Sequence, residues 1–168
     1  MLTRRAALAS LVVLALPAAA RAQTAAPASD PTALLTKLYT QAGSGGGDFV
    51  NGSKSRAKYL TKSFAALWTK AEAKVPDGVE PPIDFDPVSN SQDPDIKAYA
   101  VAVEKQDATS ATLAVTLTGS QPRQKPDDSV IRYDLVRDGA QWRIDDIRGS
   151  LDGEPWSVRK LLADSLKR

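Results

Sequence analysis

The stretch IRYDLVRDGAQWRIDDI, residues 131–147, carries apolar side chains at alternate positions on both sides of Asp138-Gly139. Alternation of this kind predicts half-buried strands. An Asp-Gly pair between two strands is a strong signal for a two-residue hairpin turn, because both central positions need a positive φ. We therefore predict a hairpin of residues 129–137 and 140–148, in which Leu135 faces Trp142 and Tyr133 faces Ile144.

The same count would place Ile131 opposite Asp146 and so bury a carboxylate beside an apolar side chain. One extra residue near Asp145 and Asp146 avoids this by bringing Ile147 into phase with the other apolar positions. We predict a β-bulge at this point.

A second hairpin is predicted from residues 97–105 and 111–118. Pairing Lys105 with Ala111 sets three apolar pairs on one face: Val103 with Leu113, Val101 with Val115, and Tyr99 with Leu117. A face that is apolar throughout fixes the register. We expect a common interior that includes Val101, Leu113, Tyr133 and Trp142. Residues 119–128 contain two prolines and several charges, which predicts an exposed crossover.

Helical periodicity flanks the strands on both sides. Asp30 and Pro31 begin a helix that Gly43 ends, a second apolar stripe runs from Ser55 to Val75 with a break near Thr61, and Pro155 begins a final helix. The other face of the second stripe carries basic residues that we expect to be solvated: Lys54, Arg56, Lys58 and Lys62. The order predicts one α+β domain over residues 31–168, with a curved antiparallel sheet of about four strands packed against two N-terminal helices and one C-terminal helix.

The first residues indicate export. Arg4 and Arg5 precede an uninterrupted apolar run over residues 6–16, and an A-x-A pattern ends at Ala22. This is the pattern of a secretory signal peptide over residues 1–22, with cleavage after Ala22 and a flexible leader over 23–30. The run is shorter than the roughly 20 residues that span a bilayer, so we expect no stable membrane anchor after cleavage. We expect a periplasmic or secreted location, reached by Sec or twin-arginine export.

Composition excludes several kinds of chemistry. The chain has no cysteine and no histidine, so it has no disulfide, no thiolate nucleophile and no imidazole base or metal ligand. Of its 22 basic residues the signal peptide takes three, which leaves 19 against 20 acidic residues. A near-neutral mature chain gives no reason to expect a nucleic-acid partner.

Two motifs carry a resemblance to a known family. Asp84-Phe-Asp86-Pro87 with Asn90-Ser-Gln92-Asp93, followed by the ending Trp142-Arg-Ile144-Asp-Asp-Ile147, resembles bacterial domain-of-unknown-function family 3828, over residues from about 31 to the end. That family consists of exported proteins, some of them lipoproteins. The resemblance implies a cone-shaped fold like that of cystatin or nuclear transport factor 2. This chain lacks the lipoprotein cysteine, so a soluble periplasmic form is implied.

The acidic loop DFDPVSNSQDPD, residues 84–95, invites a test as a calcium site. Counted from Asp84, acids fall at positions 1, 3 and 12 of an EF-hand loop, but Val88 and Ser89 stand where a ligand and a glycine are needed. We therefore expect neither calcium nor another metal, and a non-standard calcium site of Asp84, Asp86, Asn90 and Asp93 is the alternative to this expectation. Asp, Asn and Ser side chains in such a loop typically bond to nearby backbone amides. The alternative is a ligand- or partner-binding surface, with these candidates: Asp84, Asp86, Asn90, Gln92 and Asp93.

The favoured function is a non-catalytic binding or accessory module of the cell envelope, without a cofactor, whose partner is an envelope protein or a small ligand. The alternative is a cofactor-free cavity enzyme of the isomerase or dehydratase type, in which a desolvated carboxylate acts as base. Its candidate catalytic residues are Asp146, Tyr133 and Tyr99, with Asp86 as a further carboxylate. An immunity or inhibitor protein is a third hypothesis, which rests on size and export.

Overall fold

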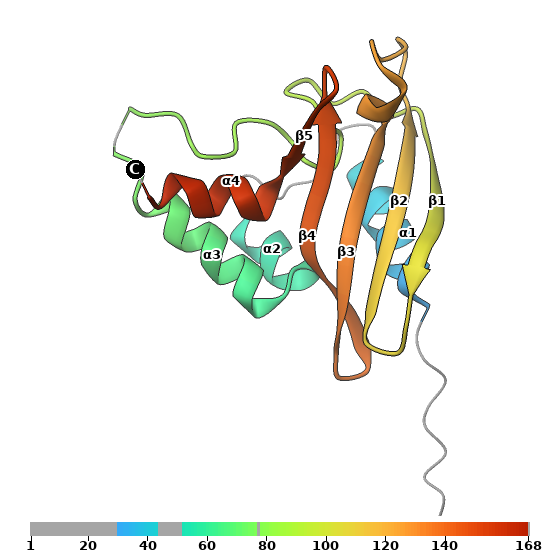
Figure 1. The fold of residues 1–168 in the computed structure, drawn as a ribbon, viewed down its shortest axis with the longest axis horizontal. Coiled ribbons are helices and arrows are strands. Elements are labelled where there is room, and N and C mark those ends of the chain that lie inside the picture. Colours follow the sequence, from blue (N-terminus) through green and yellow to red (C-terminus); the bar gives the residue numbers. More distant parts are fainter. Residues whose placement is uncertain (1–29, 44–51, 77, 168) are drawn as a thin grey trace, which may run out of the picture.

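The protein folds as an α+β domain, as predicted, around a five-stranded antiparallel sheet that is not closed into a barrel (Figure 1). The computed structural model describes residues 30–43, 52–76 and 78–167, so the expected signal peptide and nearly all of the leader lie outside it. Strands follow one another in chain order, β1–β2–β3–β4–β5. The elements are α1 (Pro31–Ala42), α2 (Ser53–Tyr59), α3 (Lys62–Glu72), β1 (Ala98–Gln106), β2 (Ser110–Thr118), the 3-10 turn η2 (Pro126–Ser129), β3 (Val130–Asp138), β4 (Gln141–Leu151), β5 (Glu154–Ser157) and α4 (Val158–Ser165).

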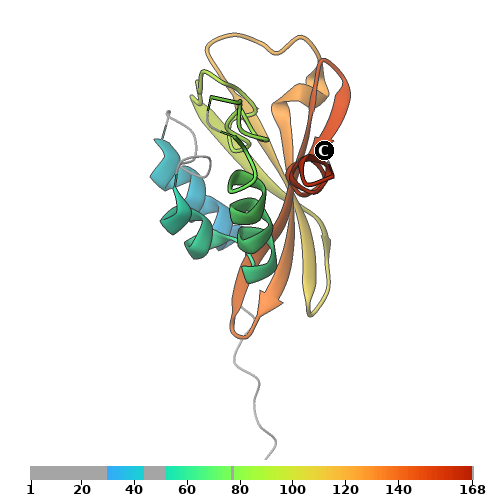
Figure 2. The same cartoon turned by 90° about the vertical axis from the view of Figure 1, so that its left-hand side faces the viewer.

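The helices lie mainly on one side of the sheet. Figures 1 and 2 show α1, α2 and α3 over one face, whereas α4 lies beside β4 and packs on α3. The core forms between the helices and this face of the sheet. Leu113, Tyr133 and Trp142 are buried there, and Val101 packs against them from β1. The predicted common interior is confirmed.

The first hairpin has the predicted register over most of its length. Tyr99 pairs with Leu117, Val101 with Val115, and Val103 with Leu113. The predicted pairing of Lys105 with Ala111 is wrong, because an irregularity at Glu104 shifts the ladder and Lys105 pairs with Thr112. The extra residue adds a bulge that strengthens the local twist near the hairpin end.

The second hairpin corrects the predicted turn and confirms the predicted bulge. Asp138 pairs with Gln141, so the two turn residues are Gly139 and Ala140, and only Gly139 has a positive φ, of 64°. A glycine at the first central position suits a type II′ turn rather than the expected type I′. The register therefore moves by two residues, which keeps every side chain on its predicted face.

In the observed register Leu135 pairs with Ile144 and Tyr133 with Ile147. Between these pairs Asp145 has no partner on β3, while Asp146 pairs with Asp134. The bulge therefore lies where the hydrophobic phase required it, and Ile147 is buried.

The helical stripe that begins near Ser55 is broken as expected. Leu60 leaves the helix and bridges Ile144 of β4, where the amide of Thr61 donates to the Ile144 carbonyl over 2.8 Å. Thr61 then caps α3 by accepting the Phe64 amide. The expected solvated position of Arg56 is wrong: its guanidinium is buried against Trp68 and donates to both Glu72 carboxylate oxygens over 2.6 and 2.8 Å.

The C-terminal segment differs from the expected helix start. Pro155 lies within β5, the fifth strand, and α4 begins after Ser157, whose hydroxyl accepts the Lys160 amide. The turn before β5 has positive φ at both central residues, 54° at Asp152 and 86° at Gly153, which is the type I′ pattern. The crossover 119–128 is mostly exposed, but Asp128 is buried at its end.

Two buried tyrosines join α1, the acidic loop and the sheet. The hydroxyl of Tyr39 donates to the carbonyl of Val88 over 2.9 Å, so its oxygen accepts the hydroxyl proton of Tyr133 over 2.8 Å. Desolvation by burial raises the pKa of both phenols above the ordinary 10.0, which keeps them neutral donors. Removing Tyr39 alone would leave two buried polar groups without partners.

We predict that the double variant Tyr39→Phe, Tyr133→Phe is more stable than the single variant Tyr39→Phe. Tyr39→Phe leaves the Tyr133 hydroxyl and the Val88 carbonyl without the hydrogen bonds that Tyr39 makes with them. This lowers the free energy of unfolding by about 1–3 kcal/mol for each group. Adding Tyr133→Phe to that variant removes one stranded group, so the double variant should be more stable than Tyr39→Phe alone. Urea unfolding of the two single variants and the double variant measures this. Strictly additive losses would contradict the directed chain of hydrogen bonds.

Candidate ligand-binding site

Hydrogen bonds between residues close in sequence fold the acidic loop on itself. Asp86 accepts the amides of Val88 and Ser89 over 3.2 and 3.0 Å, and its own amide donates to the Ser91 carbonyl. Val88 and Ser89 are fully buried beneath this turn. The Asp86 carboxylate thus fixes the loop from within, as capped turns do.

Asn90 connects the loop to three distant segments. Its side-chain amide donates to the carbonyls of Asp128 and Ser150 over 2.9 and 2.7 Å, while its side-chain oxygen accepts the indole N–H of Trp156 over 3.0 Å. Asn90 is buried and has a φ of 54°, a conformation that asparagine tolerates better than most residues. Arg123 fixes the backbone from outside by donating to the Ser89 and Asn90 carbonyls.

Asp128, at the end of the crossover, bonds to the β4–β5 turn. Its carboxylate accepts the Ser150 hydroxyl over 3.0 Å and the amides of Asp152 and Gly153 over 3.1 and 3.2 Å. Desolvation opposes ionisation of this buried group, but the bonds from Gly153, Ser150 and Asp152 outweigh it and lower its pKa. The carboxylate is therefore held charged beneath the turn.

A pocket of about 640 Å³ lies between the acidic loop and the β4–β5 hairpin. Phe85 and Trp156 form its aromatic part, with ring centroids 5.0 Å apart and planes at 69°. Leu151, which is 56% exposed, extends the apolar surface. Three exposed carboxylates line the same pocket: Asp84, Asp93 and Glu154. The size is that of small-molecule sites in general.

Gly149 determines where Trp156 lies. The two residues pair across β4 and β5, and a β-carbon on Gly149 would overlap the indole ring. With the Asn90 bond at one edge and Phe85 beside it, the indole has a fixed position. The aromatic surface of the pocket is therefore formed before any ligand arrives.

Four of the five predicted binding residues line this pocket, namely Asp84, Asn90, Gln92 and Asp93. Asp86 holds the turn instead. Sequence reasoning missed Phe85 and Trp156 as a pair, and it missed Glu154 and Leu151. The signal that could have found them is Asp152-Gly153, a second Asp-Gly pair, which predicts a hairpin that brings Trp156 back beside the loop.

The candidate catalytic residues lie apart from this pocket. Asp146 accepts the amides of Ile147 and Arg159 and the hydroxyl of Ser157, so its carboxylate anchors the start of α4. Tyr133 is buried in the core and lies on the face of the sheet opposite to Asp146. Tyr99 stacks on Tyr39 with a centroid distance of 4.9 Å, and Tyr39 in turn meets the Tyr133 ring edge-on. The structure therefore brings the two candidate tyrosines near each other but not to Asp146.

No family model matches the chain, and no curated protein or solved structure matches it either. The resemblance to family 3828 thus rests on the quoted residues alone. Within residues 30–43, 52–76 and 78–167, no group of three or more acidic, histidine or cysteine residues could hold a metal ion. No helix in those ranges is long and apolar enough to cross a membrane.

The lowered pKa of Asp128 predicts a pH dependence with a definite sign. A carboxyl group with a folded pKa below its ordinary 3.8 stabilises the fold above that pH, and the contribution is lost as pH falls towards the folded value. Asp128→Asn should be less stable than the parent at pH 7, with the difference shrinking below about pH 4. Thermal melts of both proteins between pH 7 and 2 measure it. A difference that stays constant with pH would contradict a charged Asp128.

Proposed function

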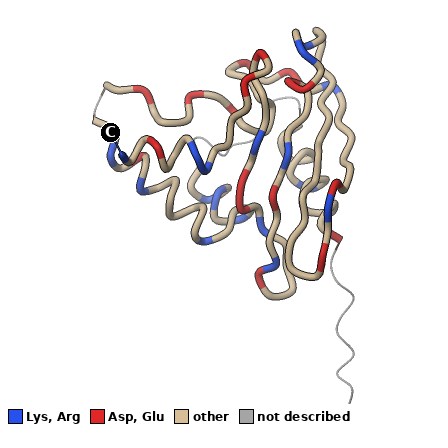
Figure 3. Tube along the Cα trace, viewed as in Figure 1, with Lys and Arg blue, Asp and Glu red and all other residues tan. Residues whose placement is uncertain are grey.

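We propose that this chain is an exported, non-catalytic binding protein, and that the pocket between the acidic loop and the β4–β5 hairpin takes a ligand with a positive charge on an apolar body. The observation that carries this is the pairing of a fixed aromatic surface, Phe85 and Trp156, with a rim of three carboxylates. Aromatic faces and carboxylates both attract cations. Figure 3 shows acidic segments of the loop and of the β4–β5 turn at the same end of the sheet.

The lining of the pocket keeps a net negative charge, because its three carboxylates outnumber its one guanidinium. Arg123 is the basic residue in its lining, and that guanidinium is bonded to the Ser89 and Asn90 carbonyls. No hydrogen bond or ion pair from the described residues engages the carboxylates of Asp93 and Glu154. These two groups are thus available to a ligand. A free amine and a lysine or arginine side chain of an envelope protein offer the same chemistry.

Catalysis has less support from the geometry. The pocket between the acidic loop and the β4–β5 hairpin is not lined by Asp146, Tyr133 or Tyr99. The carboxylate of Asp146 is already bonded to the α4 start, and Tyr133 has no exposed surface. A binding role uses the residues that do face a cavity.

Ligand class can be tested with three probes of one shape. Phenylpropyl-trimethylammonium should change the fluorescence of Trp156, because Trp68 and Trp142 are buried and Trp156 is not. Phenylpropanol and phenylpropionate are the neutral and anionic matches, and a short Phe-Arg peptide tests the protein-partner form. Glu154→Gln and Asp93→Asn should each weaken binding of the cation about two- to fivefold, while Glu80→Gln, outside the pocket, should not. Equal binding of cation and anion, or no saturable binding of the cation, would refute the ligand class.

Export is tested separately. We expect the protein from a periplasmic fraction to begin at Gln23, as read by N-terminal sequencing. Changing Arg4 and Arg5 together to lysine should block processing if the twin-arginine route is used and leave it intact if Sec is used. An unprocessed chain confined to the cytoplasm would contradict the export proposal.

A further inference from the structure

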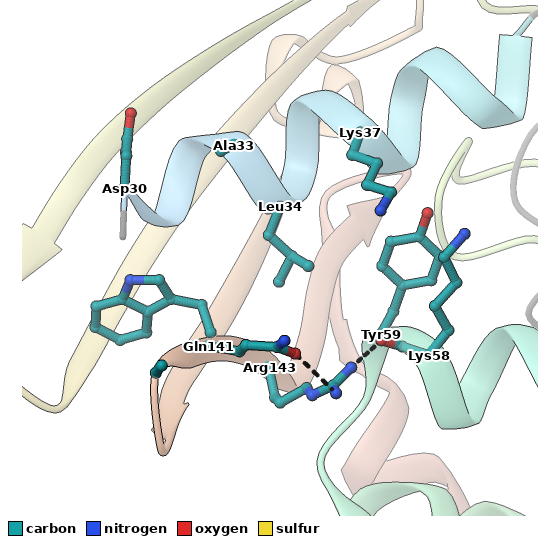
Figure 4. Close-up of a pocket in the computed structure, with 10 residues that line it drawn as sticks. Asp30, Ala33, Leu34, Lys37, Lys58, Tyr59, Gln141 and Arg143 are labelled. Carbon is teal, nitrogen blue, oxygen red and sulfur yellow. Dashed lines mark hydrogen bonds between the residues drawn. The ribbon is translucent and has the colours of Figure 1, made fainter. Parts of the chain in front are cut away.

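A second cavity, of about 400 Å³, lies at the other end of the sheet, between α1, the end of α2 and the start of β4. Figure 4 shows its lining side chains, with Leu34 and Lys37 from α1, Tyr59 and Lys58 from α2, and Arg143 from β4 around one open space. Its chemistry is the reverse of that of the acidic pocket. Three of its lining residues are cations, Lys37, Lys58 and Arg143.

The single carboxylate in the lining is engaged elsewhere. Asp30 caps α1, and its two oxygens accept the amide of Thr32 over 2.9 Å and the hydroxyl of Thr32 over 2.6 Å. Figure 4 shows Asp30 at the far end of the cavity from Lys37. The lining therefore keeps a net positive charge, with three cations against one carboxylate.

The three cations are held to different degrees. Arg143 donates to the Lys58 carbonyl and, over 3.1 Å, to the Gln141 side chain, which uses two of the five donors that a guanidinium carries. Lys58 donates to Gln41 over 2.8 Å and lies over the Tyr59 ring. Lys37 has no hydrogen bond or ion pair with any described residue. The guanidinium of Arg143, which its bonds hold in place, and the ammonium of Lys37 can together bind one anion.

Leu34 adds an apolar wall. It is half-buried, and in Figure 4 its side chain points into the space between Lys37 and Arg143. An inorganic anion would leave this surface unused, whereas an organic anion can bury an alkyl chain against it at about 0.8 kcal/mol for each methylene.

We infer that this cleft is a second binding site, for small organic carboxylates that place the anionic group among Lys37, Lys58 and Arg143 and the alkyl chain against Leu34. It is independent of the acidic pocket in residues and in the charge it selects. Binding at one site does not require that the other be occupied.

Titration with hexanoate, acetate and inorganic phosphate, followed by amide NMR shifts, tests this site. Hexanoate should bind most tightly and shift the amides of Leu34, Lys37, Lys58 and Arg143. Lys37→Gln should weaken hexanoate binding about three- to fivefold, and Leu34→Ala should reduce the preference for hexanoate over acetate. Lys70→Gln, on exposed α3 surface, is the matched control and should change nothing.

Three results would overturn the inference. The first is phosphate or acetate binding as tightly as hexanoate, which would remove the role of Leu34. The second is hexanoate binding that Lys37→Gln and Lys70→Gln affect equally, and the third is the absence of any saturable shift. Glu154→Gln should leave hexanoate binding unchanged, so failure here and failure of the proposed function are separate outcomes.

Discussion

The β-bulge at Asp145 in β4 is the constraint on which the rest of the structure depends. With Asp145 unpaired on β3, Ile144 and Ile147 both reach the core, and the two carboxylates between them are left to bond elsewhere. Asp145 accepts the Thr61 hydroxyl over 2.7 Å and the Arg159 guanidinium over 2.6 Å, so one side chain joins the starts of α3 and α4. Asp146 completes the junction through Ser157 and the Arg159 amide. A strand without the extra residue would bury one of these charges, at a cost of several kcal/mol.

Beyond the bulge, β4 carries the hairpin that builds the acidic pocket. Polar contacts hold this hairpin in place, since Asn90 and Asp128 are both buried and their side chains bond to backbone groups of the crossover, of β4 and of the β4–β5 turn. Buried polar groups of this kind are stabilising only when all their partners are present, which makes the arrangement specific. Consequently the pocket wall keeps its shape while its lining, Phe85 and Trp156 with exposed carboxylates, stays available to solvent.

The parts of this structure that follow from local rules could be predicted from the sequence. The alternation of apolar side chains predicted the sheet faces, the phase defect at Asp146 predicted the bulge, and the N-cap at Asp30 predicted α1. Each of these features depends on residues within one element or one hairpin. Register near Lys105 and at the Gly139 turn could not be predicted, since a bulge at Glu104 and a choice between two turn types change the pairing while leaving the apolar face intact. Arg56 shows the same limit. Its position on α2 suggested a solvated side chain, but its guanidinium is buried and donates to both carboxylate oxygens of Glu72, which lies on α3.

The candidate site divides along the same line. Most of its polar residues could be found in one segment of the sequence, where aspartate, asparagine and glutamine cluster, but Glu154 could not. The roles of the clustered residues could not be predicted: Asp86 and Asn90 hold the loop through hydrogen bonds, while Asp84 and Asp93 line the pocket. The aromatic half comes from two segments 71 residues apart, Phe85 and Trp156, and becomes a surface only when Gly149 lets the indole lie across β4. On the two binding proposals, the opposite charges of the cavities would let a nearly neutral chain select charged ligands. Net charge sums the acidic pocket and the basic cleft to near zero, whereas a ligand within a Debye length of about 8 Å responds only to the cavity it enters.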